Sequence, residues 1–225
     1  DTPGTIDLMG HVINPLVHNF LDLIAGAALT LDQNSDISSV FSKTNGMRKR
    51  RKINEQIASL QDKLRASFPN QSDVDIQRKI VVGVLGNDAL CGTLGATLYH
   101  IFENADRMPL SKLAYPNIPN YSGVKFVDRI VMQDTVVCKH ALQAGQEFEV
   151  KFDELHKRTT ESEKMALFGG GRHTCLGKGV SMDLWDGLVL NLKQKHIMCT
   201  VRSYKERKDH VFRIPEEFIV EVSCV

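Results

Sequence analysis

The sequence lacks a strong charge of either sign and has no closely paired cysteines. It carries 28 basic and 27 acidic residues, a formal net charge of +1. No overall field therefore draws it toward nucleic acid or anionic lipid, and we expect no nucleic-acid partner. The five cysteines are widely spread without a CxxC pair, which argues against a disulfide framework or a zinc knuckle. A reducing, cytoplasmic location fits this cysteine usage best.

Long apolar runs, repeats and low-complexity segments are also absent from the sequence. No run approaches the roughly 18 apolar residues of a membrane span, so none is expected. With 225 residues and 42% hydrophobic content, one domain over residues 1–225 can bury a sizeable core. The basic run RKRRK, Arg48–Lys52, is best explained as the solvated start of a helix, although a nuclear address or a nucleic-acid contact remains the alternative.

Helical spacing dominates the first half of the chain. Residues 6–29 predict two short helices separated at Pro15, and residues 37–45 predict another short helix. The segment 47–68 carries a narrow apolar stripe and predicts a long, mostly solvated helix. The segment 75–104 is apolar around its whole circumference, which predicts a buried central helix.

The central segment is unusually rich in small residues. Glycine costs up to about 1 kcal/mol relative to alanine in a helix, so something must offset this loss. Leu85, Ala89, Gly92 and Ala96 fall on one stripe, where a flat body or another protein segment could lie close. The sequence does not separate these two explanations.

The second half mixes strands with one more helix. Residues 125–142 predict a short helix that turns into a β-branched strand, and residues 143–155 alternate like another strand. The spacing after Gly177 predicts a helix over 177–195, and the end of the chain predicts two strands around a polar turn. The fold class expected is mainly α with small β-sheets.

The stretch FGGGRHTCLG, residues 168–177, surrounds one cysteine with glycines. Cys175 lies just ahead of the predicted helix, where unpaired N–H groups and the helix dipole favour the thiolate. The preceding glycines allow a tight turn with unusual dihedrals, and Gly177 leaves room for a planar group against the backbone.

Three kinds of chemistry could use such a turn. A nucleophilic cysteine would need His173 as a base, but side chains two residues apart in a tight turn usually diverge. A phosphate-binding loop would need a hydroxyl after Lys178, where Gly179 stands instead. Ligation of a haem iron by the thiolate accounts for the turn, the small-residue helix and the cations Arg172 and His173, which could serve a propionate.

The same stretch resembles the cysteine-ligand loop of the cytochrome P450 family. Phe168, Gly171, Cys175 and Gly177 match the F-x-x-G-x-x-x-C-x-G signature, and His173 stands where the family has Arg or His. The resemblance implies an abbreviated cytochrome P450-like fold in which a long central helix lies over haem b, with Cys175 as the iron ligand.

The resemblance extends backward with departures. LGNDA, residues 85–89, is similar to the oxygen-activating segment A-G-x-D/E-T, but Ala89 replaces the threonine and leaves Asp88 as the proton-relaying group. Counting back from the strand puts the arginine of the E-x-x-R helix at Arg129 and Phe126 at its glutamate. Lys139 stands where an arginine commonly reaches a propionate, and Gly92 is expected against the haem.

About half of an ordinary family member is missing at the front, so a partner chain or a homo-oligomer could complete the site. The leading hypothesis is a haem-thiolate oxidoreductase for a small apolar substrate, supplied by a redox partner or by peroxide. The departures at positions 89 and 126 favour a peroxide-driven or otherwise atypical reaction, including non-oxidative haem chemistry. The alternative is a non-catalytic relative that serves as a partner or scaffold.

Overall fold

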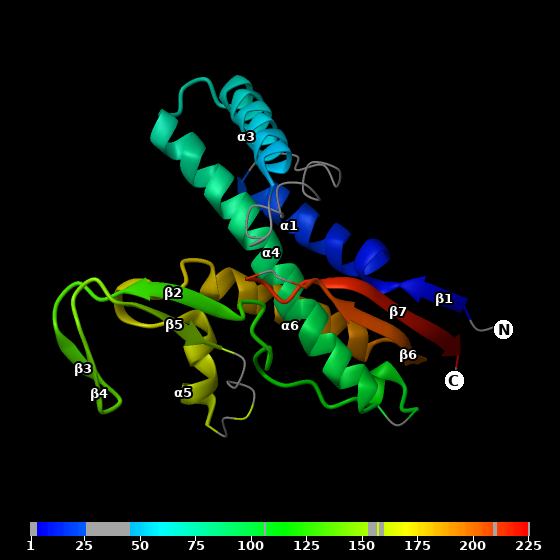
Figure 1. Cartoon of the computed structure of the whole chain (residues 1–225). Helices are drawn as coiled ribbons and strands as arrows, with labels where there is room; N and C mark the ends of the chain where they lie inside the picture. Colours follow the sequence, from blue (N-terminus) through cyan, green and yellow to red (C-terminus); the bar gives the residue numbers. More distant parts are fainter. Residues whose placement is uncertain are drawn as a thin grey trace.

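A computed structural model gives the protein as helices packed around one long central helix, with three small antiparallel sheets (Figure 1). It describes residues 4–25, 46–105, 107–152, 157, 160–208 and 211–224. The helices are η1 (Met9–Ile13, a π-helix), α1 (Asn14–Ala25), α3 (Met47–Ser67), α4 (Asp73–Glu103), α5 (Glu161–Lys164) and α6 (Lys178–Lys193), with 3₁₀ turns η3 (Leu110–Lys112), η5 (Met165–Phe168) and η6 (Gly171–His173). The fold class predicted from the sequence, mainly α with small sheets, is confirmed.

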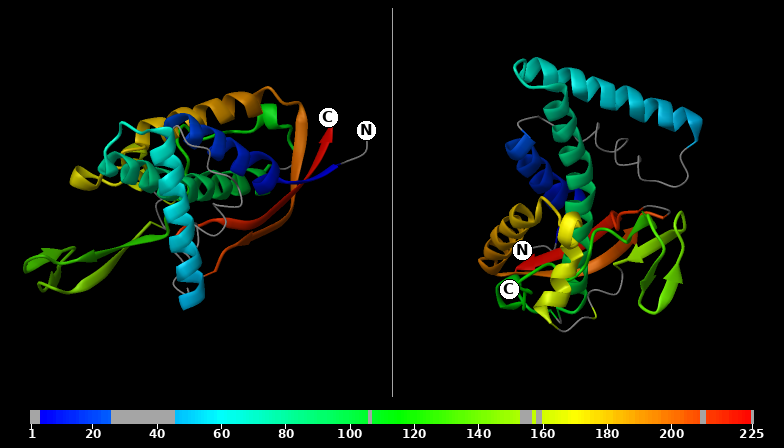
Figure 2. Two further views of the ribbon diagram at one scale, coloured as in Figure 1. Left: turned by 90° about the horizontal axis from the view of Figure 1, so that it is seen from above. Right: turned by 90° about the vertical axis from the view of Figure 1, so that its left-hand side faces the viewer.

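The described residues contain seven strands, which form three sheets. They are β1 (Gly4–Asp7), β2 (Phe126–Ile130), β3 (Thr135–Val137), β4 (His140–Leu142), β5 (Glu147–Lys151), β6 (Ile197–Glu206) and β7 (Pro215–Cys224). The largest sheet has the order β1-β7-β6, and β2-β5 and β3-β4 are two-stranded. Because β1 pairs with β7, the two ends of the chain lie side by side (Figures 1 and 2).

Helix α4 is the central element, as predicted. Its N-cap Ser72 accepts a hydrogen bond from the backbone N–H of Asp75 at 3.2 Å, and Asp73 adds an acidic group in the first turn. Its first half is buried along one face and its second half on nearly every side, and these buried side chains join one core with α1, α3, α6 and the β1-β7-β6 sheet.

On length and composition alone, α4 could cross a membrane. Its 18-residue apolar window has a mean hydropathy of 1.4, but 67% of that window is buried inside the protein. Burial in the core is the ordinary reason for such a composition in a helix that packs on every side.

The two helical elements predicted at the start of the chain are present as η1 and α1. The change from π-helix to α-helix falls at Asn14, one residue before Pro15, whose missing N–H is tolerated in the first turn of α1. The strand β1, which pairs Gly4–Asp7 with β7, was not predicted. The helix predicted over residues 37–45 lies outside the described residues.

The second correction concerns residues 125–142. The predicted short helix is wrong: Phe126–Ile130 is strand β2, paired antiparallel with β5, and β3 and β4 form a hairpin after it. Cys138 and Lys139 occupy the hairpin turn with positive φ, so their backbone cannot continue a helix. The predicted helices over 47–68 and 177–195 and the strands at 143–155 and at the C-terminal end are confirmed as α3, α6, β5, β6 and β7.

Candidate functional site

The loop between η5 and α6 folds around Cys175. Gly169 and Gly171 both have positive φ, at 71° and 55°, which glycine adopts without strain. A Cβ at Gly169 would clash with the backbone of His173, so only glycine fits there. The Cys175 N–H donates to the carbonyl oxygen of Phe168 at 2.7 Å and closes the loop. Phe168 is buried and anchors the loop to the body.

The thiol itself is presented to the outside. Cys175 is exposed, and Leu176 after it is 100% exposed. Helix α6 begins at Lys178, and a Cβ on its N-cap Gly177 would lie 3.8 Å from the Cys175 sulfur. A free sulfur is thus held at the start of a helix of 16 residues, next to Gly177.

Two of the predicted cationic residues share this loop, and the third does not. Arg172 and His173 lie in η6, and both are exposed. Lys139 lies in the turn of the β3-β4 hairpin, which projects away from the α4–α6 body (Figure 1). Arg129 and Phe126 lie in β2 rather than in a helix, so an E-x-x-R helix at these positions is ruled out.

On α4, Asp88 and Ala89 occupy different surroundings. Asp88 is fully buried, and burial raises the pKa of its carboxyl to about 7, although a hydrogen bond from Asn87 and the charge of Arg207 act in the opposite direction. Ala89 is half-buried, and its carbonyl oxygen lies against Gly123 of the loop before β2. Both residues stand next to the turn of α4 where Leu85 is 40% exposed.

The small residues farther along α4 lie against other segments of the chain. A Cβ on Gly92 would lie 3.0 Å from the Arg213 carbonyl oxygen and from the Gly123 Cα, and one on Gly95 would lie 2.6 Å from Pro215. Close packing of another segment, one of the two explanations of the stripe, accounts for Gly92 and Gly95. Contact of Gly92 with a cofactor stays a prediction.

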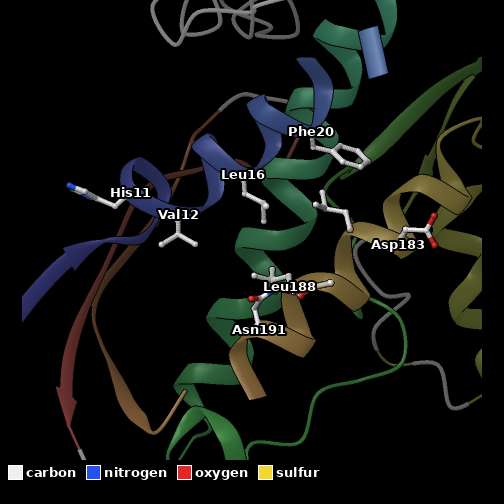
Figure 3. A pocket seen from close by; sticks show the side chains of 9 residues that line it. His11, Val12, Leu16, Phe20, Asp183, Leu188 and Asn191 are labelled. Atoms are coloured by element: carbon white, nitrogen blue, oxygen red, sulfur yellow. Dashed lines mark hydrogen bonds between the residues drawn. The ribbon is translucent and has the colours of Figure 1, made fainter. Parts of the chain in front are cut away.

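A separate apolar groove lies between η1–α1 and α6 (Figure 3). It encloses about 570 Å³ and is walled by Leu16 and Phe20 on one side and by Leu184 and Leu188 on the other. Figure 3 shows Asp183 and Asn191 at its edge. The Cys175 loop is not among the residues that line it.

The described residues form no group of three or more His, Cys, Asp and Glu side chains suited to a metal ion. A bare metal site is therefore not assembled in the described part of the chain. A haem iron, by contrast, needs only one or two donors from the protein, because the porphyrin ring supplies four of its ligands.

Sequence reasoning missed a set of buried polar residues around Asp88. His18, at 7% exposure, and Asn87, at 8%, are both buried between α1 and α4. A lone histidine on an apolar helix is usually structural, so the sequence offered little signal. The one available clue is that Asn14 and His18 are four residues apart, which puts both on the same face of a helix.

Comparison with known proteins shows a likeness of fold. No protein-family model matches the chain, and no curated protein does. Among solved structures, CalO2 matches with a TM-score of 0.77 at 12% identity, covering 97% of this chain and 68% of its own. P450 RauA, complexed with a biosynthetic intermediate of aurachin RE, matches with a TM-score of 0.75 at 15% identity, covering 96% and 66%.

A thermophilic cytochrome P450 from Sulfolobus tokodaii matches with a TM-score of 0.70 at 15% identity, covering 100% of this chain and 71% of its own. The chain thus spans about two thirds of the length of the structures that it matches. Identities this low show the fold and not the activity. The chain has a cytochrome P450-like fold, with α4 as its long central helix.

Proposed function

We propose that the chain binds haem b as a haem-thiolate protein, with Cys175 as the iron ligand. The observation that carries the proposal is the Cys175 loop: an exposed thiol at the start of α6, closed by the Cys175–Phe168 hydrogen bond, within a cytochrome P450-like fold. Gly177 leaves the space next to the sulfur without a side chain, and the positive-φ glycines shape the turn before it. These features fit a thiolate under a planar ring.

The neighbouring residues fit the same ligand. Arg172 supplies an exposed cation and His173 an exposed imidazole on the Cys175 loop for carboxylate groups such as propionates. Val81, Val82 and Leu85 leave apolar side chains 40–52% exposed on α4, as a helix that covers a porphyrin would. Lys139 and Gly92 remain weaker candidates, because the first lies on the β3-β4 turn and the second lies against backbone.

When bound, a thiolate-ligated haem supplies oxidative chemistry on small molecules. We propose an oxidoreductase that oxidises a small apolar substrate, with peroxide or a redox partner as the source of oxidising equivalents. Ala89 offers no hydroxyl beside Asp88, which favours a peroxide-driven or otherwise atypical reaction. We also propose a cytoplasmic location and a single haem domain.

About a third of the length of the structures that this chain matches is not covered by it. A partner chain or a second copy is accordingly proposed to complete the substrate side. P450BioI, another fold neighbour, was solved with a ligated acyl carrier protein. A carrier-bound substrate is therefore one candidate among small apolar substrates.

The second candidate is a non-catalytic relative that acts as a partner or scaffold. It is favoured by β2, which replaces the E-x-x-R helix at Phe126 and Arg129. The retained glycine loop argues against a non-catalytic role, because a chain without haem has no need of that turn.

The test is an absorption spectrum of the reduced, carbon monoxide-bound protein after reconstitution with haem. We expect the Soret band of a thiolate-ligated haem in the wild type and its loss in Cys175→Ala. Cys138→Ser is the matched control, because Cys138 is also an exposed free thiol but lies on the β3-β4 turn. Wild-type protein that takes up no haem, or a Cys175→Ala spectrum equal to the wild type, would refute the assignment.

A further inference from the structure

A largely buried polar cluster joins α1 to α4. On α1 it contains Asn14 and His18, and on α4 it contains Asn87, Asp88 and Cys91. The Cys91 thiol donates to Asn14 Oδ1 at 3.4 Å and lies 3.8 Å from Asn87 Oδ1. Burial raises the pKa of this thiol, so it stays a neutral donor. A side-chain network of this kind fixes the orientation of its members.

Within the cluster, the two carboxyl oxygens of Asp88 differ in their hydrogen bonding. Asn87 Nδ2 donates to Asp88 Oδ1 at 3.1 Å, while Oδ2 is buried without a hydrogen-bond partner among the described residues. An unsatisfied carboxylate oxygen in the core is costly when charged. Oδ2 is therefore the atom where a proton is held most favourably.

His18 acts on Asp88 through Asn87. The His18 ring forms a hydrogen bond with the Asn87 side chain, and this bond raises the pKa of His18 against the larger, lowering effect of burial. Because Asn87 Nδ2 donates to Asp88, Asn87 Oδ1 is the atom left to accept from the ring, and it also faces the Cys91 thiol. Donation into Oδ1 polarises the amide and strengthens its Nδ2 donation to Asp88.

We propose that His18 is a positioning residue that, through Asn87, holds Asp88 by Oδ1 and leaves Oδ2 to take up and release a proton beside Ala89. The use of this proton rests on the proposed function, but the arrangement itself needs no haem. Asp88 and His18 also meet other ionisable groups: Asp22 on α1 faces His18, Cys91 lies one turn along α4, and Arg207 from the end of β6 faces Asp88.

The test follows the Asp88 carboxyl in the full chain by carbon-13 NMR, with its resonance assigned by its absence in Asp88→Asn. We expect Asn87→Leu to bind the Asp88 proton about tenfold more tightly, because a hydrogen bond to the charged form is lost. His18→Leu should act in the same direction, by about threefold, since the amide loses its orienting donor. His18→Gln keeps an N–H donor and should stay close to the wild type.

Two further variants keep the result interpretable. His11→Leu is the matched control, because His11 is exposed and bonds the backbone oxygen of Asp7 instead. His18→Phe replaces the ring without an N–H and serves if His18→Leu does not fold. Equal Asp88 proton affinities in the wild type and in the His18→Leu or His18→Phe protein would overturn the proposal. A change in the proton affinity of Asp88 in protein that takes up no haem would support the positioning role of His18, even though the proposed function would then fail.

Discussion

Replacing Asp88 by Asn should change how the stability of the protein depends on pH. The carboxyl is fully buried, and its pKa is raised by burial from 3.8 to about 7. Between these two values, the folded state binds a proton that the unfolded state has released. The free energy of unfolding therefore falls as pH rises through this range, and the loss is complete above about pH 7.

The size of the effect follows from the two pKa values. Their difference corresponds to a free energy on the order of 4 kcal/mol. Over an accessible range from about pH 5 to about pH 8, the wild type should lose about 3 kcal/mol relative to Asp88→Asn. Asn is close in shape, keeps an acceptor for Asn87 and carries no charge, so the variant lacks this loss.

The assay is urea unfolding at a series of pH values, followed by far-ultraviolet circular dichroism. Subtracting the wild type from Asp88→Asn removes the titration of all other groups. Asp75→Asn is the control of opposite sign, because hydrogen bonds from Ser72 lower the pKa of this exposed carboxyl. Its difference from the wild type should shrink as pH falls. A difference between Asp88→Asn and wild type that stays flat with pH would show that Asp88 is not a buried, proton-holding group.

Three further substitutions test the packing around α4 and α6. Gly123→Ala should destabilise the protein by about 3 kcal/mol in urea unfolding, because the new Cβ would clash with the Ala89 carbonyl oxygen and lie 2.6 Å from Thr93 N. Gly187→Ala is the control. Its new Cβ would meet nothing within 4 Å, so this substitution should stabilise the protein by up to about 1 kcal/mol. Ser72→Ala should lower stability by about 1 kcal/mol in thermal unfolding through loss of the α4 N-cap, and an unchanged midpoint would contradict this. Trp185→Phe should lower the free energy of unfolding by about 1–3 kcal/mol, because the Pro116 carbonyl oxygen loses the Trp185 Nε1 donor at 2.9 Å. An unfolding curve equal to that of the wild type would contradict this hydrogen bond.

Local patterns predicted the helices and the cysteine loop well. Helices α3, α4 and α6 each show apolar spacing over many residues, and the glycines around Cys175 need only their own backbone conformations. These signals lie within one short stretch of chain. The fold class and the long central helix could therefore be predicted from the sequence alone.

Non-local pairing explains what the sequence did not reveal. Strand β1 has only four residues, and its partner β7 lies more than 200 residues away along the chain. Residues Phe126–Ile130 were assigned to a short helix from their local pattern, and the E-x-x-R positions were placed there by counting back from the strand, whereas pairing with β5 makes these residues a strand. The buried cluster around Asp88 needs α1 and α4 side by side, which no single-segment pattern encodes.

The hydroxyl missing at Ala89 is not supplied from the next turn of α4. Thr93 lies four residues on, and its Oγ1 accepts a hydrogen bond from the Gly123 N–H at 2.9 Å. Gly123 itself lies so close to Ala89 and Thr93 that a side chain there would not fit, so this bond is part of the packing. Asp88 Oδ2 thus stays as the proton-holding atom on this stretch of the helix. That is the structural reason why we favour an atypical reaction over one that needs an acid and an alcohol together.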